Sequence, residues 1–300
     1  MNLDRADGVL NSAAASKLHV VVLGLGSVGS YSAMELAYSF RRWDLIDPDV
    51  LEKANTERHA LDKRYVGRPK VEGVKELMSY RNIDNPNTIR THVGRAQDVL
   101  NTIPKPDILI VAIDDPESLA FVNAWCVHND VFAVYAGVYA KGAGIQIMVV
   151  PTPQDVCWQC MAVQMGAEHV KVLERDQNYG IDVAQLPEKM MAVPALRWVV
   201  SSVASEVARY VIKYVNGEEI IPHIFVRVND RREILRPPSK TVEEIAGFID
   251  IQPEMNILPL VTMDPNGDVV LHHSSVSHRA RRWNLCPHHR KQERLSLSDI

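Results

Sequence analysis

The sequence has few cysteines, little net charge and no apolar run long enough to span a membrane, and each shortage excludes a class of protein. Four cysteines in 300 residues are too few for a disulfide scaffold. Lys and Arg number 33 against 37 Asp and Glu, and the resulting net charge of −4 gives no general attraction to nucleic acid or anionic lipid. The best candidate for a membrane span, residues 192–215, is interrupted by four charged side chains, and its apolar residues fall at helical rather than continuous spacing, so we expect no membrane association. The N-terminus has neither a signal-peptide nor a transit-peptide pattern, and we expect a cytoplasmic protein.

What the chain does contain is an alternation of strand and helix patterns. Apolar, often β-branched runs predict strands at residues 19–23, 43–46, 108–113, 131–135, 145–150 and 224–228. Helical spacing predicts helices at residues 31–40, 69–80, 116–128 and 194–215. This order predicts an α/β protein with a mostly parallel, twisted sheet flanked by helices.

Changes in composition and periodicity along the chain predict four parts. Residues 1–16 are expected to form a flexible N-terminal arm and residues 17–156 a nucleotide-binding core. Residues 157–220 contain an irregular stretch and an amphipathic helix, and residues 221–300 form a smaller C-terminal lobe with a basic, His-rich end. Turns are expected at residues 229–230 and 264–267.

A glycine cluster lies between the first strand and the first helix. Gly24, Gly26 and Gly29 follow the Gly-x-Gly-x-x-Gly spacing that lets a backbone approach a pyrophosphate at a helix N-terminus, as in Rossmann-like folds. Asp47, 21 residues after Gly26, is placed to hold ribose hydroxyls. A glycine turn that binds no nucleotide is the ordinary structural alternative.

The polar residues after Asp47 separate this chain from a typical dehydrogenase. The series comprises Asp47 and Asp49, then Asn55 and Arg58, then Gly67 and Lys70, followed further on by Asp114, Asp115, Asn123 and Cys126. At these spacings the sequence resembles the ThiF/MoeB/HesA family of the ubiquitin-activating enzyme-like adenylyltransferase superfamily. The resemblance covers residues 18–135 and, through the cysteines, most of the remaining chain.

This resemblance implies ATP- and Mg²⁺-dependent adenylation of a C-terminal glycine carboxylate, giving an acyl-adenylate and pyrophosphate. The substrate would be a small ubiquitin-like or sulfur-carrier protein. Asp47 would bind ribose, Asn55, Arg58 and Lys70 would line the triphosphate, Asp114 would hold Mg²⁺, and Asp49 and the three glycines would complete the nucleotide site. Each residue also has an ordinary explanation: a surface ion pair for Arg58, a solvated lysine at a helix start for Lys70, and a helix N-cap for Asp114.

The electrostatics of the implied reaction account for these residue types. A C-terminal carboxylate has a pKa of about 3.5 and needs no base at neutral pH. Its difficulty is repulsion by the triphosphate, since two unit charges 4 Å apart interact by about 4 kcal/mol at an effective dielectric constant of 20. Arg58 and Lys70 are suitable cations for phosphate oxygens, and a metal held by Asp114 would offset the remaining charge.

Two short cysteine-containing segments predict a zinc site. Cys157 and Cys160 form a Cys-x-x-Cys, while Cys286 and His289 form a Cys-x-x-His, and together they provide the four ligands of tetrahedral Zn²⁺. His288 is an alternative fourth ligand, and a thioredoxin-like redox pair is disfavoured because no thioredoxin-like strand-helix context surrounds Cys157. Relatives that form a thioester carry a further cysteine after the first zinc segment.

Residues 161–215 contain no cysteine that could form a thioester. Cys126 lies in an apolar helix, where we expect a buried, unreactive thiol. We therefore expect no catalytic thioester and transfer of the acyl-adenylate to an external sulfur donor or amine. The chain departs from the family pattern at Leu119, where an arginine is common. Relatives also borrow an arginine from a second subunit, for which Arg5 is the candidate; a homodimer would suit the apolar stripe of residues 194–215, although packing on the sheet explains that stripe equally.

Three other functions remain open. A related enzyme would adenylate a peptide. A nicotinamide-dependent oxidoreductase would use only the glycine turn and Asp47. A non-catalytic subunit of a heterodimer would bind ATP without turning it over, or would not bind ATP. Nucleic acid is set aside because aromatic residues are scarce in the basic C-terminal end.

Overall fold

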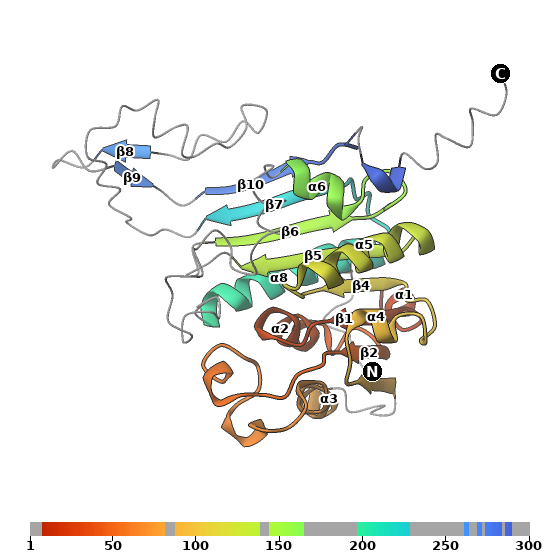
Figure 1. Cartoon of the computed structure of the whole chain (residues 1–300), viewed down its shortest axis with the longest axis vertical. Coiled ribbons are helices and arrows are strands. Elements are labelled where there is room, and N and C mark those ends of the chain that lie inside the picture. Colours follow the sequence, from red (N-terminus) through yellow and green to blue (C-terminus); the bar gives the residue numbers. More distant parts are fainter. Residues whose placement is uncertain are drawn as a thin grey trace.

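The computed structural model describes residues 8–81, 88–138, 144–164, 197–228, 261–263, 269–271, 274–283 and 286–289. Its central feature is an eight-stranded sheet in the order β10-β7-β6-β5-β4-β1-β2-β3, which can be followed from top to bottom in Figure 1. The strands are β1 (His19–Leu23), β2 (Arg42–Ile46), β3 (Ile89–His92), β4 (Ile108–Val111), β5 (Phe132–Val138), β6 (Gly144–Val150), β7 (His223–Val228) and β10 (Ser274–Arg279). A separate antiparallel pair joins β8 (Val261–Met263) to β9 (Val269–Leu271).

Five of the eight strands are parallel. β5, β4, β1, β2 and β3 pair in parallel, whereas β6, β7 and β10 extend the sheet in antiparallel fashion. The chain moves outward from β1 to β2 and β3, then returns to place β4 on the other side of β1. In such sheets ligands bind at the carboxyl ends of the strands where the direction reverses, here between β1 and β4.

Helices cover both faces of the sheet. One face packs on α2 (Ser27–Leu36), α3 (Lys70–Arg81) and α8 (Arg197–Val215), and the other on α4 (Ala96–Val99), α5 (Pro116–Asn129) and α6 (Trp158–Gln164). Alternate residues of β1 divide between the two layers, with Val20 and Val22 on the α8 side and Val21 and Leu23 on the α5 side. The predicted mostly parallel, Rossmann-like sheet is therefore confirmed.

Several predicted boundaries were wrong in informative ways. The first helix begins at Ser27, immediately after the glycine turn, and ends at Leu36 rather than at residue 40. The strand β3 and the short helix α4 were not predicted, and residues 158–164 of the predicted irregular stretch form α6. The expected turn at residues 229–230, the turn at 264–267 and the basic residues 290–294 lie outside the described residues.

The apolar stripe of α8 is buried within the chain. Its members Val199, Val200, Val203, Val207, Tyr210 and Val211 belong to the core against α2 and the sheet. Tyr214 stacks on Phe132 of β5, with ring centroids 4.1 Å apart and planes at 12°. The stripe is thus explained by packing on the sheet, and it gives no support to the predicted homodimer.

The N-terminal segment contains one short helix, α1 (Ser12–Ala15). The amide of Asn216, just after α8, holds this segment by accepting the Asn11 N–H and donating to the Val9 carbonyl, both at 2.9 Å. Arg5 lies outside the described residues. Among the helices that the structure describes, none has the length and apolar character needed to cross a membrane.

Candidate active site and metal centre

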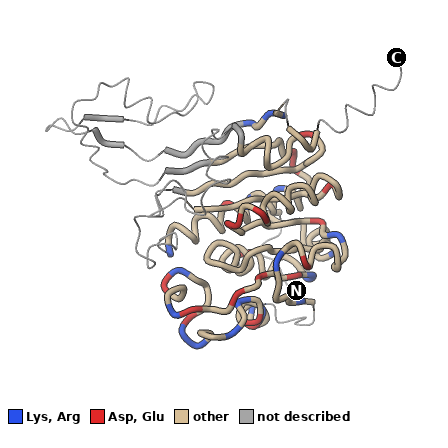
Figure 2. The backbone as a smooth tube through the Cα atoms, in the orientation of Figure 1, with Lys and Arg blue, Asp and Glu red and all other residues tan. Residues whose placement is uncertain are grey.

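A cavity of about 720 Å³ opens at the carboxyl ends of β1 and β4, where the strand order reverses. Its lining includes eight of the residues predicted to bind nucleotide: Gly24, Gly26, Asp47, Asp49, Asn55, Arg58, Lys70 and Asp114. Figure 2 shows that acidic and basic residues are closely mixed along the segment between β2 and α3, which forms one wall. The structure therefore brings together residues that are up to 90 positions apart in the chain (114 minus 24).

The three glycines differ in what they do. Gly24 adopts φ +80°, and a Cβ there would lie 2.5 Å from the Ala112 carbonyl oxygen after β4. A Cβ on Gly29 would lie 1.8 Å from the Gly24 carbonyl oxygen, so Gly29 lets α2 pack against the turn and does not itself line the cavity. A Cβ on Gly26 would meet nothing within 4 Å, because Gly26 faces the open cavity at the N-terminus of α2. Backbone groups at that position can approach a phosphate.

Asp47 is a buried carboxylate directly after β2, with only 4% of its surface exposed. Its Oδ2 accepts the Leu25 N–H at 2.6 Å and its Oδ1 accepts the Asp49 N–H at 2.8 Å. Burial raises the pKa of Asp47, although the nearby Lys70 ammonium and these N–H groups oppose the shift. The carboxylate is thus fixed in place beside the glycine turn, where a sugar hydroxyl would meet it.

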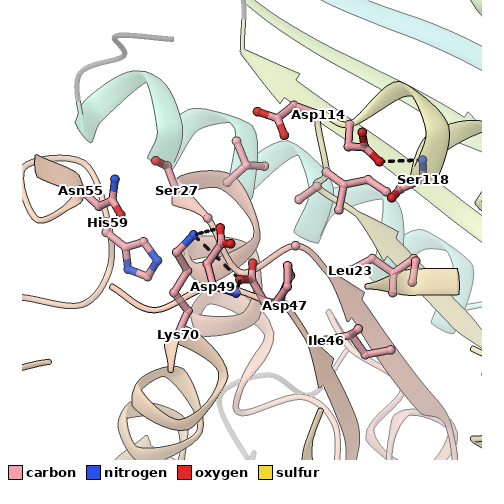
Figure 3. A pocket seen from close by; sticks show the side chains of 18 of the residues that line it. Leu23, Ser27, Ile46, Asp47, Asp49, Asn55, His59, Lys70, Asp114 and Ser118 are labelled. Carbon is pink, nitrogen blue, oxygen red and sulfur yellow. Dashed lines mark hydrogen bonds and ion pairs between the residues drawn. The ribbon is translucent and has the colours of Figure 1, made fainter. Parts of the chain in front are cut away.

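Lys70 begins α3 and is almost entirely buried. Its Nζ lies 2.6 Å from Asp49 Oδ2 and 3.8 Å from Asp47 Oδ1, and Figure 3 shows the ammonium group directed at both carboxylates. Its backbone N–H also donates to the Asp49 carbonyl at 3.0 Å. The structure excludes the solvated lysine that a helix start would ordinarily carry, and it places a cation in the floor of the cavity.

The loop between β2 and α3 supplies Asn55, Arg58 and His59 to the cavity. Asn55 closes a 3₁₀ turn (Lys53–Asn55), and its Oδ1 accepts the Glu52 N–H at 3.2 Å. Arg58 is half-buried. His59 is 3% exposed and had no role assigned from the sequence, because a single histidine in a polar loop gives no spacing signal.

Asp114 and Asp115 divide their tasks at the end of β4. Asp115 is the N-cap of α5, and its side chain accepts the Ser118 N–H at 2.8 Å. The N-cap explanation for Asp114 was therefore wrong by one residue, and the exposed Asp114 carboxylate remains at the cavity (Figure 3). Leu119 is buried in the core, so it adds no cation here. Arg95, which the sequence did not single out, lines the cavity after β3.

A second site lies away from this cavity, where Cys157, Cys160, Cys286 and His289 converge. One ligand atom from each lies within 4.8 Å of all the others, and all four residues are buried, so the group could hold a metal ion. The sulfur of Cys157 is 3.9 Å from that of Cys160 and 3.6 Å from that of Cys286. Sulfur ligands of tetrahedral zinc, with bonds of about 2.3 Å, lie about 3.8 Å apart. The chemistry and spacing of this set fit zinc.

Surrounding groups orient these ligands. Nδ1 of His289 lies 3.4 Å from the Cys160 sulfur, and its Nε2 is 3.1 Å from the Pro153 carbonyl, which fits Nε2–H as the donor and Nδ1 as the ligand atom. The Trp283 N–H donates to the Cys160 sulfur at 3.3 Å. Of the two candidate histidines, the structure brings His289 and not His288 into the cluster.

Cys126 is separate from both sites. It is 1% exposed on α5, and burial raises the pKa of its thiol to about 12. The predicted burial of this thiol is confirmed. A thiol in this state is a poor nucleophile at neutral pH.

A glycine turn at the reversal point of a doubly wound sheet, with a buried acidic residue after the next strand, defines an α/β protein of the Rossmann-like class. The ThiF family model matches residues 2–241, and the chain belongs to the ThiF family. The predicted family is thus confirmed.

Two comparisons with known proteins agree with this assignment. "Ubiquitin-like modifier-activating enzyme 5" of Drosophila mojavensis is 26% identical over 186 residues, which are 57% of this chain and 46% of the relative. The Caenorhabditis elegans protein of the same name is 26% identical over 188 residues, 58% of this chain and 44% of that relative. The chain therefore spans about half the length of the curated relatives it matches.

Among solved structures, Escherichia coli MccB with MccA-N7isoASN superposes with a TM-score of 0.63, at 17% identity over 93% of this chain and 68% of MccB. MccB with ATP gives a TM-score of 0.62 at the same identity, over 93% of this chain and 68% of MccB. At this level of identity the likeness establishes the fold.

Proposed function

We propose that the chain uses ATP and Mg²⁺ to adenylate the C-terminal carboxylate of a small ubiquitin-like or sulfur-carrier protein that ends in glycine, releasing pyrophosphate. The observation that carries the proposal is the convergence of Gly26, Lys70, Arg58 and Asp114 on one cavity at the carboxyl ends of β1 and β4. Its volume of about 720 Å³ lies within the range of about 300–1,000 Å³ typical of small-molecule sites.

The charges lining the cavity support the need for a divalent cation. Five carboxylates (Asp47, Asp49, Glu52, Asp114 and Asp115) face three basic side chains (Arg58, Lys70 and Arg95) among the described lining residues. A triphosphate and a substrate carboxylate would add further negative charge. Since Mg²⁺ is usually bound by one or two carboxylates together with substrate phosphates, the exposed Asp114 suits it, and the metal would offset charge on the phosphate oxygens.

The proposed reaction follows from what these residues can hold in place. The turn at Gly26 and the N-terminus of α2 would bind phosphate oxygens, while Asp47 would bind the ribose. With Arg58 and Lys70 reducing repulsion, a carboxylate oxygen of the substrate attacks the α-phosphorus and the bond to pyrophosphate breaks. The carboxylate is already ionised, so no proton is transferred in this step.

Two kinds of similar protein suggest the class of substrate. Enzymes named for activating a ubiquitin-like modifier share 26% identity with this chain, and they favour a carrier protein with a C-terminal glycine. MccB, solved with MccA and with ATP, favours the second candidate, a peptide. We expect no thioester on the enzyme, because the buried Cys126 thiol is kept protonated.

Exchange of labelled pyrophosphate into ATP, run with Gly-Gly-tailed proteins and with short peptides, tests this proposal. Wild type should catalyse exchange only with the correct substrate, and Lys70→Ala and Asp114→Ala should abolish it. Cys126→Ala is the matched control and should retain exchange. Persistent exchange in Asp114→Ala would refute the metal assignment, and a conjugate on Cys126 that thiol reagents release would refute transfer without a thioester.

The zinc assignment extends the proposal to the second site. We propose that Zn²⁺ occupies the cluster of Cys157, Cys160, Cys286 and His289 as a structural ion. It would close all four tetrahedral positions with protein ligands, which is the arrangement of structural rather than catalytic zinc.

A further inference from the structure

The buried imidazole of His59 lies where the β2–α3 loop meets the glycine turn, and both of its nitrogens are engaged. We infer that His59 is a positioning residue, which fixes the distance between the glycine turn and the loop that carries Arg58 by hydrogen bonding to Leu25 of the turn and to Leu61 of the loop. This inference rests on the proposed nucleotide function and names a part of its machinery that neither the motif spacing nor the charges pointed to.

The contacts of the ring define one neutral tautomer. Its Nε2 lies 2.6 Å from the Leu25 carbonyl oxygen, so this nitrogen carries the proton and donates. The Leu61 N–H donates to Nδ1 at 3.0 Å, so that nitrogen is unprotonated. Burial lowers the pKa of His59 to about 4, against the opposing hydrogen bond to Leu25. At neutral pH the ring is therefore uncharged and cannot act as a further cation for phosphate.

On one side the ring fixes the glycine turn. Leu25 lies between Gly24 and Gly26, and its backbone is held at both ends: its N–H donates to Asp47 at 2.6 Å and its carbonyl accepts from His59. The two contacts join the carboxylate proposed to bind ribose, the turn proposed to bind phosphate and the loop that follows β2. Movement of the imidazole would therefore shift the Leu25 peptide beside Gly26.

On the other side the ring belongs to the residue that directly follows Arg58, and its Nδ1 accepts the Leu61 N–H of the same loop. The N–H groups of Arg58 and His59 both donate to the Asn55 carbonyl, at 3.1 and 3.0 Å. From α2, the Tyr31 hydroxyl donates to the His59 carbonyl at 3.4 Å. Arg58 thus lies on a short backbone turn that the His59 ring links to the Leu25 carbonyl. A nucleotide that contacts both Gly26 and Arg58 would depend on this spacing.

Two polar substitutions distinguish the ring's hydrogen bond to Leu25 from its hydrogen bond to Leu61. His59→Gln can present an amide N–H close to the position of Nε2 and keep the bond to Leu25. His59→Asn is shorter, reaching the position of Nδ1 near Leu61 but not the Leu25 carbonyl. His128→Asn, at an exposed histidine of α5, is the matched control. The affinities of ATP and AMP, each with Mg²⁺, are measured by calorimetry, and folding is checked by thermal melting.

We expect His59→Asn to weaken ATP binding about tenfold and AMP binding less than about threefold, because AMP does not extend to Arg58. His59→Gln and His128→Asn should remain within about threefold of wild type for both nucleotides. A merely structural histidine would lower both affinities equally or lower only the melting temperature.

The outcomes distinguish this inference from the proposed function. If wild type binds neither ATP nor AMP, the proposed function fails and the inference fails with it. If wild type binds ATP but His59→Asn binds it equally well, loses both nucleotides to the same extent, or matches His59→Gln, only the inference about His59 is overturned. Should His59→Asn fail to fold, a tenfold loss of ATP affinity in the folded His59→Gln would overturn it as well.

Discussion

Asp44 in the middle of β2 and Asp47 directly after β2 lie three positions apart, and their pKa values are shifted in opposite directions. Burial alone would raise the pKa of Asp44, but hydrogen bonds from His19, Arg90 and His92 lower it to about 2. Asp47 has two backbone N–H donors and an ammonium group at 3.8 Å, and its pKa is raised. Asp44 therefore joins β1, β2 and β3, while Asp47 lines the cavity.

The Asp44 cluster predicts a specific loss of stability in acid. The folded pKa of about 2 is below the ordinary value of 3.8, so the stabilisation is complete above pH 3.8 and is lost as the pH falls toward 2. The lowered pKa of Asp44 corresponds to about 2 kcal/mol of folding stability at neutral pH. Urea unfolding of Asp44→Asn between pH 2 and 6 should show a shallower pH dependence than wild type.

Asp62→Asn is the control for this measurement. Asp62 also has a pKa lowered to about 2, by Arg64, but the pair is exposed and screened by water. Its substitution should change the acid dependence far less. An unchanged acid dependence in Asp44→Asn would contradict the role assigned to Asp44.

At the scale of elements, the glycine turn between β1 and α2 contains one position that matters for folding and another that matters for ATP binding. Gly29→Ala places a Cβ 1.8 Å from a backbone oxygen and should cost about 3 kcal/mol or more, because α2 must move away from the turn. Gly26→Ala meets nothing within 4 Å and should melt near the wild-type temperature. It should nevertheless weaken ATP binding about tenfold by occupying space beside the phosphates. Equal melting temperatures for the two variants would contradict this division.

The metal cluster joins α6 to the segment after β10, and zinc content measures that connection. Purified protein should hold about one zinc per chain, and Cys286→Ser and His289→Ala should lose it, together with a large part of the stability that a structural zinc provides, which can reach about 10 kcal/mol. His288→Ala, at the neighbouring histidine outside the cluster, should keep the metal. Zinc loss in His288→Ala with retention in His289→Ala would reverse the ligand assignment.

The sequence predicted elements whose own residues carry the pattern. The apolar runs of β1 and β4 were found because both faces of these strands are buried. β3 was missed because Arg90 and His92 look like loop residues, and the hydrogen bonds that tie both side chains to Asp44 on β2 come from a distant part of the chain. The short helix α6 gives too few turns to reveal a period.

For the candidate site, spacing predicted which residues meet but not how they are bonded. The burial of Lys70 depends on Asp49, 21 residues earlier, and no local pattern shows it. The choice of Asp115 rather than Asp114 as N-cap depends on backbone angles at the end of β4. His59 was missed because its partners are backbone groups of Leu25 and Leu61, which have no signature in side-chain chemistry.

For the whole molecule, nucleotide binding should stabilise the fold, since the cavity joins β1, β4, the β2–α3 loop and α3. ATP with Mg²⁺ at about a hundred times its dissociation constant adds about 2.7 kcal/mol, which raises the melting temperature of a chain of this length by roughly 4 °C. NADH at equal concentration should produce no shift. A shift with NADH and none with ATP would favour the oxidoreductase alternative. The homodimer and the cytoplasmic location stay predictions.

The long sequence separation within the metal cluster has a consequence for biosynthesis. All described residues that line the cavity fall between Leu23 and Val138, so that site can assemble early as the ribosome extends the chain. Cys157 and Cys160 must wait for partners 129 residues downstream. Until then the nascent polypeptide carries two thiols, three positions apart, without the other two zinc ligands. An oxidising environment during translation would convert these thiols to a disulfide, which could not bind the ion.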